Sequence, residues 1–91
     1  MNNDFSKVTI VLPSLNPDDK LNKVVEGLLE AGFKDIVLVN DGSDEAHLEP
    51  FRQAGLHKEV TLLVHEVNKG KGRALKTAFS YVVITERIRQ G

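Results

Sequence analysis

The sequence predicts an α/β fold in which a three-stranded parallel sheet is flanked by helices. Three short, continuously apolar segments predict strands that are buried on both faces: Val8 to Leu12, Ile36 to Val39, and Val60 to Val64. A helical pattern or a helix-start signal follows each segment, so the element order is β-α-β-α-β-α. Because crossovers between parallel strands are right-handed, this order makes one half of a Rossmann-like fold.

The stretch after the first strand predicts a helix with one apolar face. Pro13 is expected to end the strand, and the turn Pro17-Asp18-Asp19 supplies aspartates that can cap a helix start. The apolar residues that follow recur with the spacing of one helix face: Leu21, Val24, Val25, Leu28 and Leu29. Gly32 is expected to end this helix, because glycine readily adopts the left-handed conformation found just beyond a C-cap.

The two later helical stretches differ in regularity. Between Glu45 and Ala54 the pattern is weak, and Pro50 cannot occupy a helix interior. This segment is therefore either two short pieces or a helix that begins near Pro50. The last helix is expected to begin near Gly70 to Gly72 and to carry one apolar face: Ala74, Leu75, Ala78, Phe79, Val82 and Val83.

Length and composition narrow the class of protein. We expect the 91 residues, 41% of them hydrophobic and 27% charged, to form a single globular domain over residues 1–91. A net charge of -1 argues against a nucleic-acid partner, and the lack of cysteine excludes disulfides and thiolate metal sites. No apolar run approaches the ~20 residues that span a bilayer, and the polar N-terminus lacks a signal-peptide core. These features lead us to expect a cytoplasmic chain.

A polar cluster follows each predicted strand. The clusters are Pro13 to Asp19, Asn40 to Asp44, and His65 to Arg73. In parallel sheets the carboxyl ends of the strands share one edge, and ligands bind just beyond it. The order of elements therefore predicts that these three loops surround one candidate binding site.

The third cluster, NKGKGRAL, has the chemistry of an anion site. Its glycines permit close backbone approach, the helix start offers free N–H groups, and Lys71 and Arg73 add positive charge. It is not a P-loop, which follows the first strand and needs Ser or Thr after the lysine, and Leu75 breaks the GxGxxG pattern. A solvated basic helix start with a glycine turn is an equal alternative.

The other polar residues also allow two interpretations. Asp41 could belong to an ordinary turn, or it could accept hydrogen bonds from a ligand at the strand tip. The cluster after the first strand could be a simple turn or a shelf against a flat ring. We expect the histidines to be surface or packing residues, and Lys69 occupies the second histidine position of HExxH. The histidines are His47, His57 and His65.

Taken in order, three segments resemble the start of a family 2 glycosyltransferase with the GT-A fold. They are VTIVLPSLNP, IVLVNDGSDE and NKGKGRAL, and the resemblance extends from about Val8 to Val83. It implies a Rossmann-like half of a GT-A fold that holds the nucleotide part of a sugar nucleotide. It also implies a parent enzyme that transfers a sugar from a UDP- or GDP-type donor to an acceptor hydroxyl or a lipid phosphate.

The resemblance assigns roles to particular residues. Residues from Pro13 onward would flank the base and ribose, Asp41 would accept from a uracil or guanine ring N–H, and the third loop would approach the base or phosphates. The implied nucleotide-binding residues are Pro13, Leu15, Asn16, Asp41, Gly42, Ser43, Asn68, Gly70, Lys71, Gly72 and Arg73. The family usually has an aromatic residue at Leu15, a glutamate at Pro17 and often an aspartate at Asn40.

The family's metal-binding DxD motif has no counterpart, since no two aspartates lie two positions apart. We therefore expect an N-terminal fragment that is inactive alone, with Mg²⁺ or Mn²⁺ and any membrane association belonging to the full-length protein. Exposed sheet edges would favour self-association of such a fragment. Two alternatives remain: a non-catalytic nucleotide-binding or interaction module, and a nucleotidyltransferase-like domain. PSLNPDD after the first strand argues against the latter, which usually has a glycine-rich basic loop there.

Overall fold

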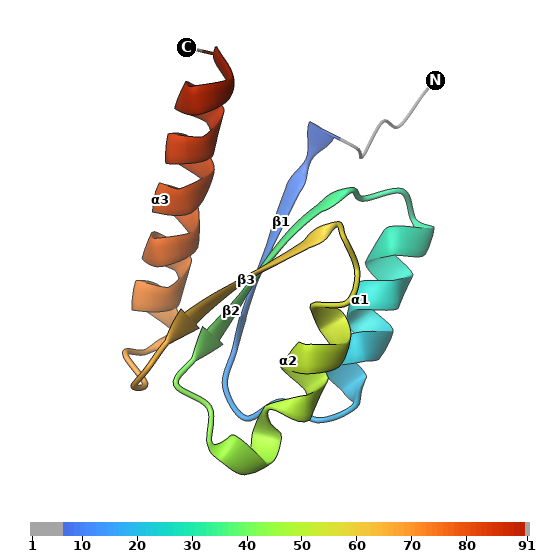
Figure 1. Cartoon of the computed structure of the whole chain (residues 1–91), viewed down its shortest axis with the longest axis vertical. Coiled ribbons are helices and arrows are strands. Elements are labelled where there is room, and N and C mark those ends of the chain that lie inside the picture. Colours follow the sequence, from blue (N-terminus) through green and yellow to red (C-terminus); the bar gives the residue numbers. More distant parts are fainter. Residues whose placement is uncertain (1–6, 91) are drawn as a thin grey trace.

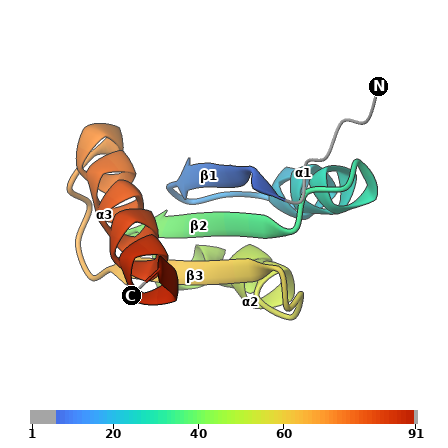
Figure 2. The ribbon, with the colours of Figure 1, turned by 90° about the horizontal axis from the view of Figure 1, so that it is seen from above.

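The chain folds into three layers, with a three-stranded parallel sheet between helices on its two faces, as the sequence predicts. The computed structural model describes residues 7–90, and their side chains as far as Val82. The element order is β1 (Thr9–Ser14), α1 (Lys20–Glu30), β2 (Asp35–Asp41), η2 (Glu45–His47), α2 (Glu49–Ala54), β3 (Val60–His65) and α3 (Lys71–Gln90). The strands lie side by side in the order β1-β2-β3. α1 and α2 cover one face of the sheet and α3 covers the other (Figures 1 and 2).

All three strands run further toward their carboxyl ends than predicted. The expectation that Pro13 ends the first strand is wrong, because β1 continues to Ser14 with Pro13 opposite Val39 in the register. Within the described sheet β1 is an edge strand, where the missing N–H of proline is tolerated. β2 continues through Asp41, which lies opposite His65 at the end of β3. The polar rim residues are therefore held by the sheet and do not belong only to loops.

The first helix ends as predicted. Gly32 has φ 105°, its N–H donates to the carbonyl of Leu29 at 3.1 Å, and the N–H of Phe33 donates to the carbonyl of Leu28 at 3.1 Å. This pair of bonds is a Schellman motif, which satisfies carbonyls that the helix leaves unpaired. At the other end, Asp18 Oδ1 accepts the N–H of Lys20 at 2.9 Å, whereas Asp19, the N-cap residue, makes no capping hydrogen bond with its side chain.

The later helices resolve the remaining alternatives. The Glu45 to Ala54 segment is two short pieces, η2 and α2, with Pro50 in the first turn of α2. α3 buries Ala74 and Ala78 against the sheet, but the predicted apolar face is only partly covered, since Leu75 and Phe79 are exposed. The three described strands present too narrow a surface to cover both sides of α3. The Val83 side chain lies outside the described part of the structure.

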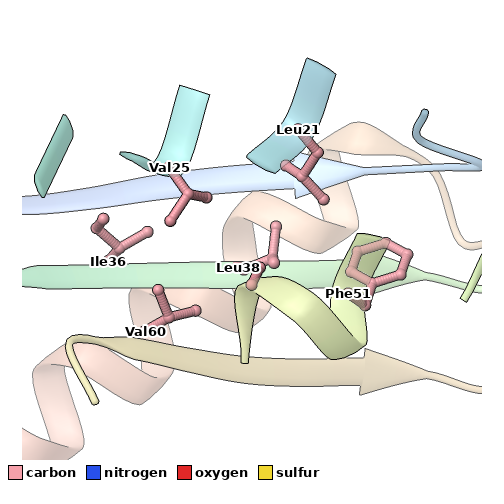
Figure 3. Packing of buried hydrophobic residues seen from close by; sticks show 7 residues of the cluster. Leu21, Val25, Ile36, Leu38, Phe51 and Val60 are labelled. Atoms are coloured by element: carbon pink, nitrogen blue, oxygen red, sulfur yellow. The ribbon is translucent and has the colours of Figure 1, made fainter. Parts of the chain in front are cut away.

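The central strand organises the core. On one face of β2, Ile36 and Leu38 pack against α1 and α2 (Figure 3), and on the other face Val37 and Val39 pack against α3. All four side chains are fully buried. Because successive side chains of a strand point to opposite faces, a continuously apolar β2 is what a two-sided core requires.

The outer strands leave apolar surface uncovered within the described residues. On β3, Leu62 and Val64 are exposed, and both β1 and β3 have an unpaired edge in the described sheet. Self-association through these surfaces stays a prediction.

None of the helices in residues 7–90 is both long and apolar enough to cross a lipid bilayer.

Two leucine truncations test the core. Leu38→Ala removes a fully buried side chain, whereas Leu56→Ala makes the same chemical change where 83% of the residue is exposed. We expect Leu38→Ala to lower the free energy of unfolding by about 2–5 kcal/mol and Leu56→Ala to change it by less than about 0.5 kcal/mol. Urea unfolding followed by circular dichroism measures both. Equal effects would contradict the two-sided core around β2.

Candidate functional site

The three strand-end loops meet around one cavity. It has a volume of about 280 Å³ and takes its lining from the ends of β1 and β2 and from the loop before α3. The lining residues are Pro13, Ser14, Leu15, Asp41, Asn68, Gly70 and Lys71. The cavity therefore lies beyond the carboxyl ends of the strands, where the sequence predicts the site.

A reciprocal pair of hydrogen bonds joins the first two loops. The N–H of Asn16 donates to Ser43 Oγ at 2.8 Å, and the N–H of Asp44 donates to Asn16 Oδ1 at 2.8 Å. Asn16 takes a left-handed conformation, with φ 49°, which asparagine tolerates better than most residues. Asn40 Oδ1 accepts the N–H of Ser43 at 2.9 Å. Asn16 and Ser43 thus hold the loops together and do not line the cavity.

Gly42 lets the second and third loops approach each other closely. Its φ is 77°, and a Cβ at this position would lie 2.2 Å from the backbone nitrogen of Asn68. No other amino acid fits there without moving the backbone. The third loop turns at Gly70, with φ 90°, where the N–H donates to Asn68 Oδ1 at 2.8 Å.

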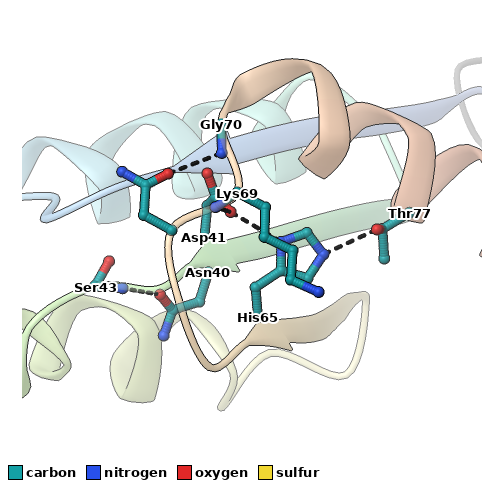
Figure 4. Close-up of polar contacts among 8 residues, drawn as sticks. Asn40, Asp41, Ser43, His65, Lys69, Gly70 and Thr77 are labelled. Carbon is teal, nitrogen blue, oxygen red and sulfur yellow. Dashed lines mark hydrogen bonds and ion pairs between the residues drawn. The ribbon is translucent and has the colours of Figure 1, made fainter.

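Asp41 is a buried carboxylate at the centre of this arrangement (Figure 4). Its Oδ1 accepts from His65 Nδ1 at 2.8 Å and from the N–H of Lys69 at 3.0 Å. The hydrogen bond from His65, and next the backbone bond from Lys69, hold the pKa of Asp41 below its ordinary value, against the opposing effect of burial. The side chain is therefore ionised at neutral pH and acts only as an acceptor.

The structure divides the predicted site residues into three groups. Six border the cavity: Pro13, Leu15, Asp41, Asn68, Gly70 and Lys71. Asn16, Gly42 and Ser43 build the frame that joins the loops. Gly72 and Arg73 instead border an open hollow of about 650 Å³ beside α3, together with Val11, Leu75, Lys76 and Phe79.

Sequence reasoning missed His65, which was expected to be a surface or packing residue. Its side chain is only 10% exposed and bridges Asp41 and Thr77, with His65 Nε2 at 2.9 Å from Thr77 Oγ1. In the sequence His65 directly follows the third apolar run, but its place opposite Asp41 depends on the strand register, which only the structure gives. Thr77, on the sheet-facing side of a helix, gives no comparable signal in the sequence.

The described residues do not form a metal site. In the part of the chain with described side chains, no group of three or more histidine or carboxylate side chains could hold an ion. The rim offers one buried carboxylate, Asp41, and its Oδ1 is already occupied by two donors. This set of ligands does not fit Mg²⁺ or Mn²⁺, which bind through several oxygen atoms.

Comparison with known proteins assigns the family. The sequence profile of glycosyl transferase family 2 matches residues 9–83, which include all three loops, so the chain belongs to this family. An uncharacterized protein of Methanocaldococcus jannaschii is 29% identical over 84 residues, which are 90% of this chain and 33% of that protein. The chain thus spans about one third of this curated relative. No solved structure gives a significant match.

A glycine substitution tests the close approach of the loops. Gly42→Ala forces a left-handed alanine and a clash with the Asn68 backbone, so we expect a loss of about 2 kcal/mol or more in the free energy of unfolding. Gly27→Ala is the matched control, because its Cβ would meet no atom within 4 Å on α1. The control should be neutral or stabilising by up to about 1 kcal/mol. Urea denaturation of both variants measures the difference, and a neutral Gly42→Ala would contradict the described contact.

The ionisation of Asp41 predicts a pH dependence. Because its pKa is lower in the folded chain, the carboxylate stabilises the fold above the ordinary aspartate pKa, and this contribution is lost as pH falls below about 4. Asp41→Asn should therefore have a lower free energy of unfolding than the unsubstituted chain at pH 7, and the difference between the two should be smaller at pH 3. Denaturant unfolding at both pH values measures this, with exposed Asp44→Asn as the control. A difference that does not shrink in acid would refute the assignment.

Proposed function

We propose that this chain is the nucleotide-binding part of a glycosyltransferase and that its cavity binds a sugar nucleotide of UDP or GDP type. One observation carries the proposal: an ionised carboxylate and a basic helix start border the same cavity, at the carboxyl edge of the sheet. Membership of glycosyl transferase family 2 supports a nucleotide-sugar donor. The sugar would pass to an acceptor hydroxyl or a lipid phosphate.

The base end of the cavity is assigned to Asp41. Asp41 borders the cavity, and the hydrogen bonds from His65 and Lys69 hold its carboxylate by Oδ1. An ionised oxygen facing a base favours a ring N–H, which uracil has at N3 and guanine at N1. Cytosine and adenine present a lone pair at the corresponding ring nitrogen, so they would meet Asp41 as a second acceptor. The exposed Leu15 would give the ring an apolar contact in place of aromatic stacking.

The diphosphate end is assigned to the loop before α3. Lys71 is the first residue of a 20-residue helix, whose N-terminal N–H groups and dipole favour an anion. Gly70 borders the cavity and has no side chain to obstruct a phosphate group. Lys71 itself borders the cavity, and its ammonium supplies a mobile positive charge.

Sugar transfer is assigned to the parent protein, and we propose that this chain alone is inactive. The proposal is supported by a cavity that gathers binding groups but no described set of metal ligands. A non-catalytic nucleotide-binding module is the remaining alternative. The parent gene distinguishes the two, because a strand followed by DxD beyond Gly91 would favour the enzyme. Turnover of any sugar nucleotide by the purified 91-residue chain would refute inactivity.

Calorimetry tests the binding proposal. UDP or GDP should bind, and CDP or ADP respectively should bind about tenfold more weakly, because replacing a donor by an acceptor beside a carboxylate loses a charged hydrogen bond. Asp41→Asn and Asp41→Ala should remove most of this preference. Asp44→Asn, an exposed change on the same loop, is the control and should leave binding unchanged.

A second variant separates the two ends of the cavity. Lys71→Ala should weaken UDP or GDP binding by about threefold to tenfold and leave the affinity for uridine or guanosine unchanged, since nucleosides carry no phosphate. Circular dichroism confirms that each variant is folded. If the folded Asp41→Ala variant binds all four diphosphates with unchanged affinities, and so keeps the preference, the role of Asp41 is rejected.

A further inference from the structure

His65 connects the two ends of the proposed binding cavity. It lies at the end of β3, between the Asp41 carboxylate and the Thr77 hydroxyl on α3 (Figure 4). The ring is 10% exposed and Asp41 is 5% exposed, so neither bond is a solvated surface contact. Asp41 belongs to the base end of the cavity, and α3 carries Lys71 at the phosphate end.

The protonation chemistry keeps this connection intact in either form of the ring. An ionised carboxylate only accepts, so Nδ1 of His65 carries the hydrogen that is shared with Asp41 Oδ1. In the neutral ring Nε2 is then an acceptor, and the Thr77 hydroxyl donates to it. If the ring gains a proton, Nε2 donates and the same hydroxyl accepts, because a threonine oxygen can do both.

The bond to Thr77 adds a directional contact to the apolar packing of α3. The fully buried contacts under α3 come from Ala74 and Ala78, whose small side chains allow close approach to the sheet, and the partly buried Val82 packs against the same cluster. A hydrogen bond from the sheet to Thr77 fixes the position of the helix along its axis. Lys71 lies six residues earlier on the same helix, about 9 Å along the axis.

We propose that His65 is a positioning residue that couples base recognition to phosphate recognition. Through Nδ1 it holds the Asp41 carboxylate by Oδ1 at the cavity wall, and so sets the orientation in which that carboxylate meets the base. Through Nε2 and Thr77 it sets where α3 begins, and therefore where Lys71 meets the diphosphate. This inference rests on the proposed function, since it concerns how the base and the diphosphate are bound at the two ends of the same cavity.

Four variants separate the two halves of the connection. In His65→Asn the amide nitrogen replaces Nδ1, so the bond to Asp41 is kept and that to Thr77 is lost. In His65→Gln the amide nitrogen replaces Nε2, so the bond to Thr77 is kept and the bond to Asp41 is lost. Thr77→Val removes only the hydroxyl, and His65→Leu removes both bonds. Thr61→Val, the same change at a half-buried threonine near the opposite end of β3, is the control.

Two affinity ratios from calorimetry are the readout. The base ratio is the Kd of CDP divided by that of UDP, or the Kd of ADP divided by that of GDP. The phosphate ratio is the Kd of the nucleoside divided by that of its diphosphate. We expect His65→Asn and Thr77→Val to lower the phosphate ratio by about threefold to tenfold and keep the base ratio. His65→Gln should lower the base ratio and keep the phosphate ratio, His65→Leu should lower both, and Thr61→Val should change neither.

The outcomes distinguish this inference from the proposed function. Suppose that the unsubstituted chain shows a base preference and that the folded variants keep both ratios while losing only stability. His65 is then structural, and the inference is overturned while the proposed function stands. If His65→Asn and His65→Gln lower the same ratio, the separation into two halves is wrong. If the unsubstituted chain binds none of the four nucleotides, the proposed function fails, and the inference fails with it.

Discussion

The buried carboxylate of Asp41 is the constraint on which the rim depends. A charge removed from water needs partners, and Asp41 finds them in the His65 ring from β3 and the Lys69 N–H from the following loop. These bonds tie the third loop to the end of β2. Gly42, one residue on, permits the backbone of that loop to lie within reach. One buried charge therefore determines how two of the three loops meet.

The polar residues of the rim divide between frame and cavity, and the division changes how variants should be interpreted. Asn16 and Ser43 use their polar atoms on each other's loop, so their loss would disturb every ligand alike. Asp41 supports the fold through the bonds to Oδ1, and its second role, contact with the base, is the proposed one. Substitution of Asp41 thus affects stability and selectivity together, and Lys71, which is exposed, offers the cleaner test of binding.

Two predictions failed because they depended on neighbours that are distant in sequence. Pro13 ends a strand only where its missing N–H is needed, and at the edge of the described sheet it is not. Periodicity placed Ala74, Leu75 and Phe79 on one apolar face, but the width of the sheet decides how much of that face is covered. His65 was expected to be a surface or packing residue, and its bonds went unrecognised because its partners come from β2 and α3.

The sequence by itself determined the order of elements, the parallel sheet, the helix end at Gly32 and the rim on which the candidate site lies. These depend on local signals: apolar runs, helical periodicity and turn residues act over a few positions. Only the tertiary structure decided which polar residues face the cavity and which join the loops. It also placed His65 between Asp41 and Thr77. Hydrogen bonds between distant residues depend on strand register and helix placement, which no local pattern records.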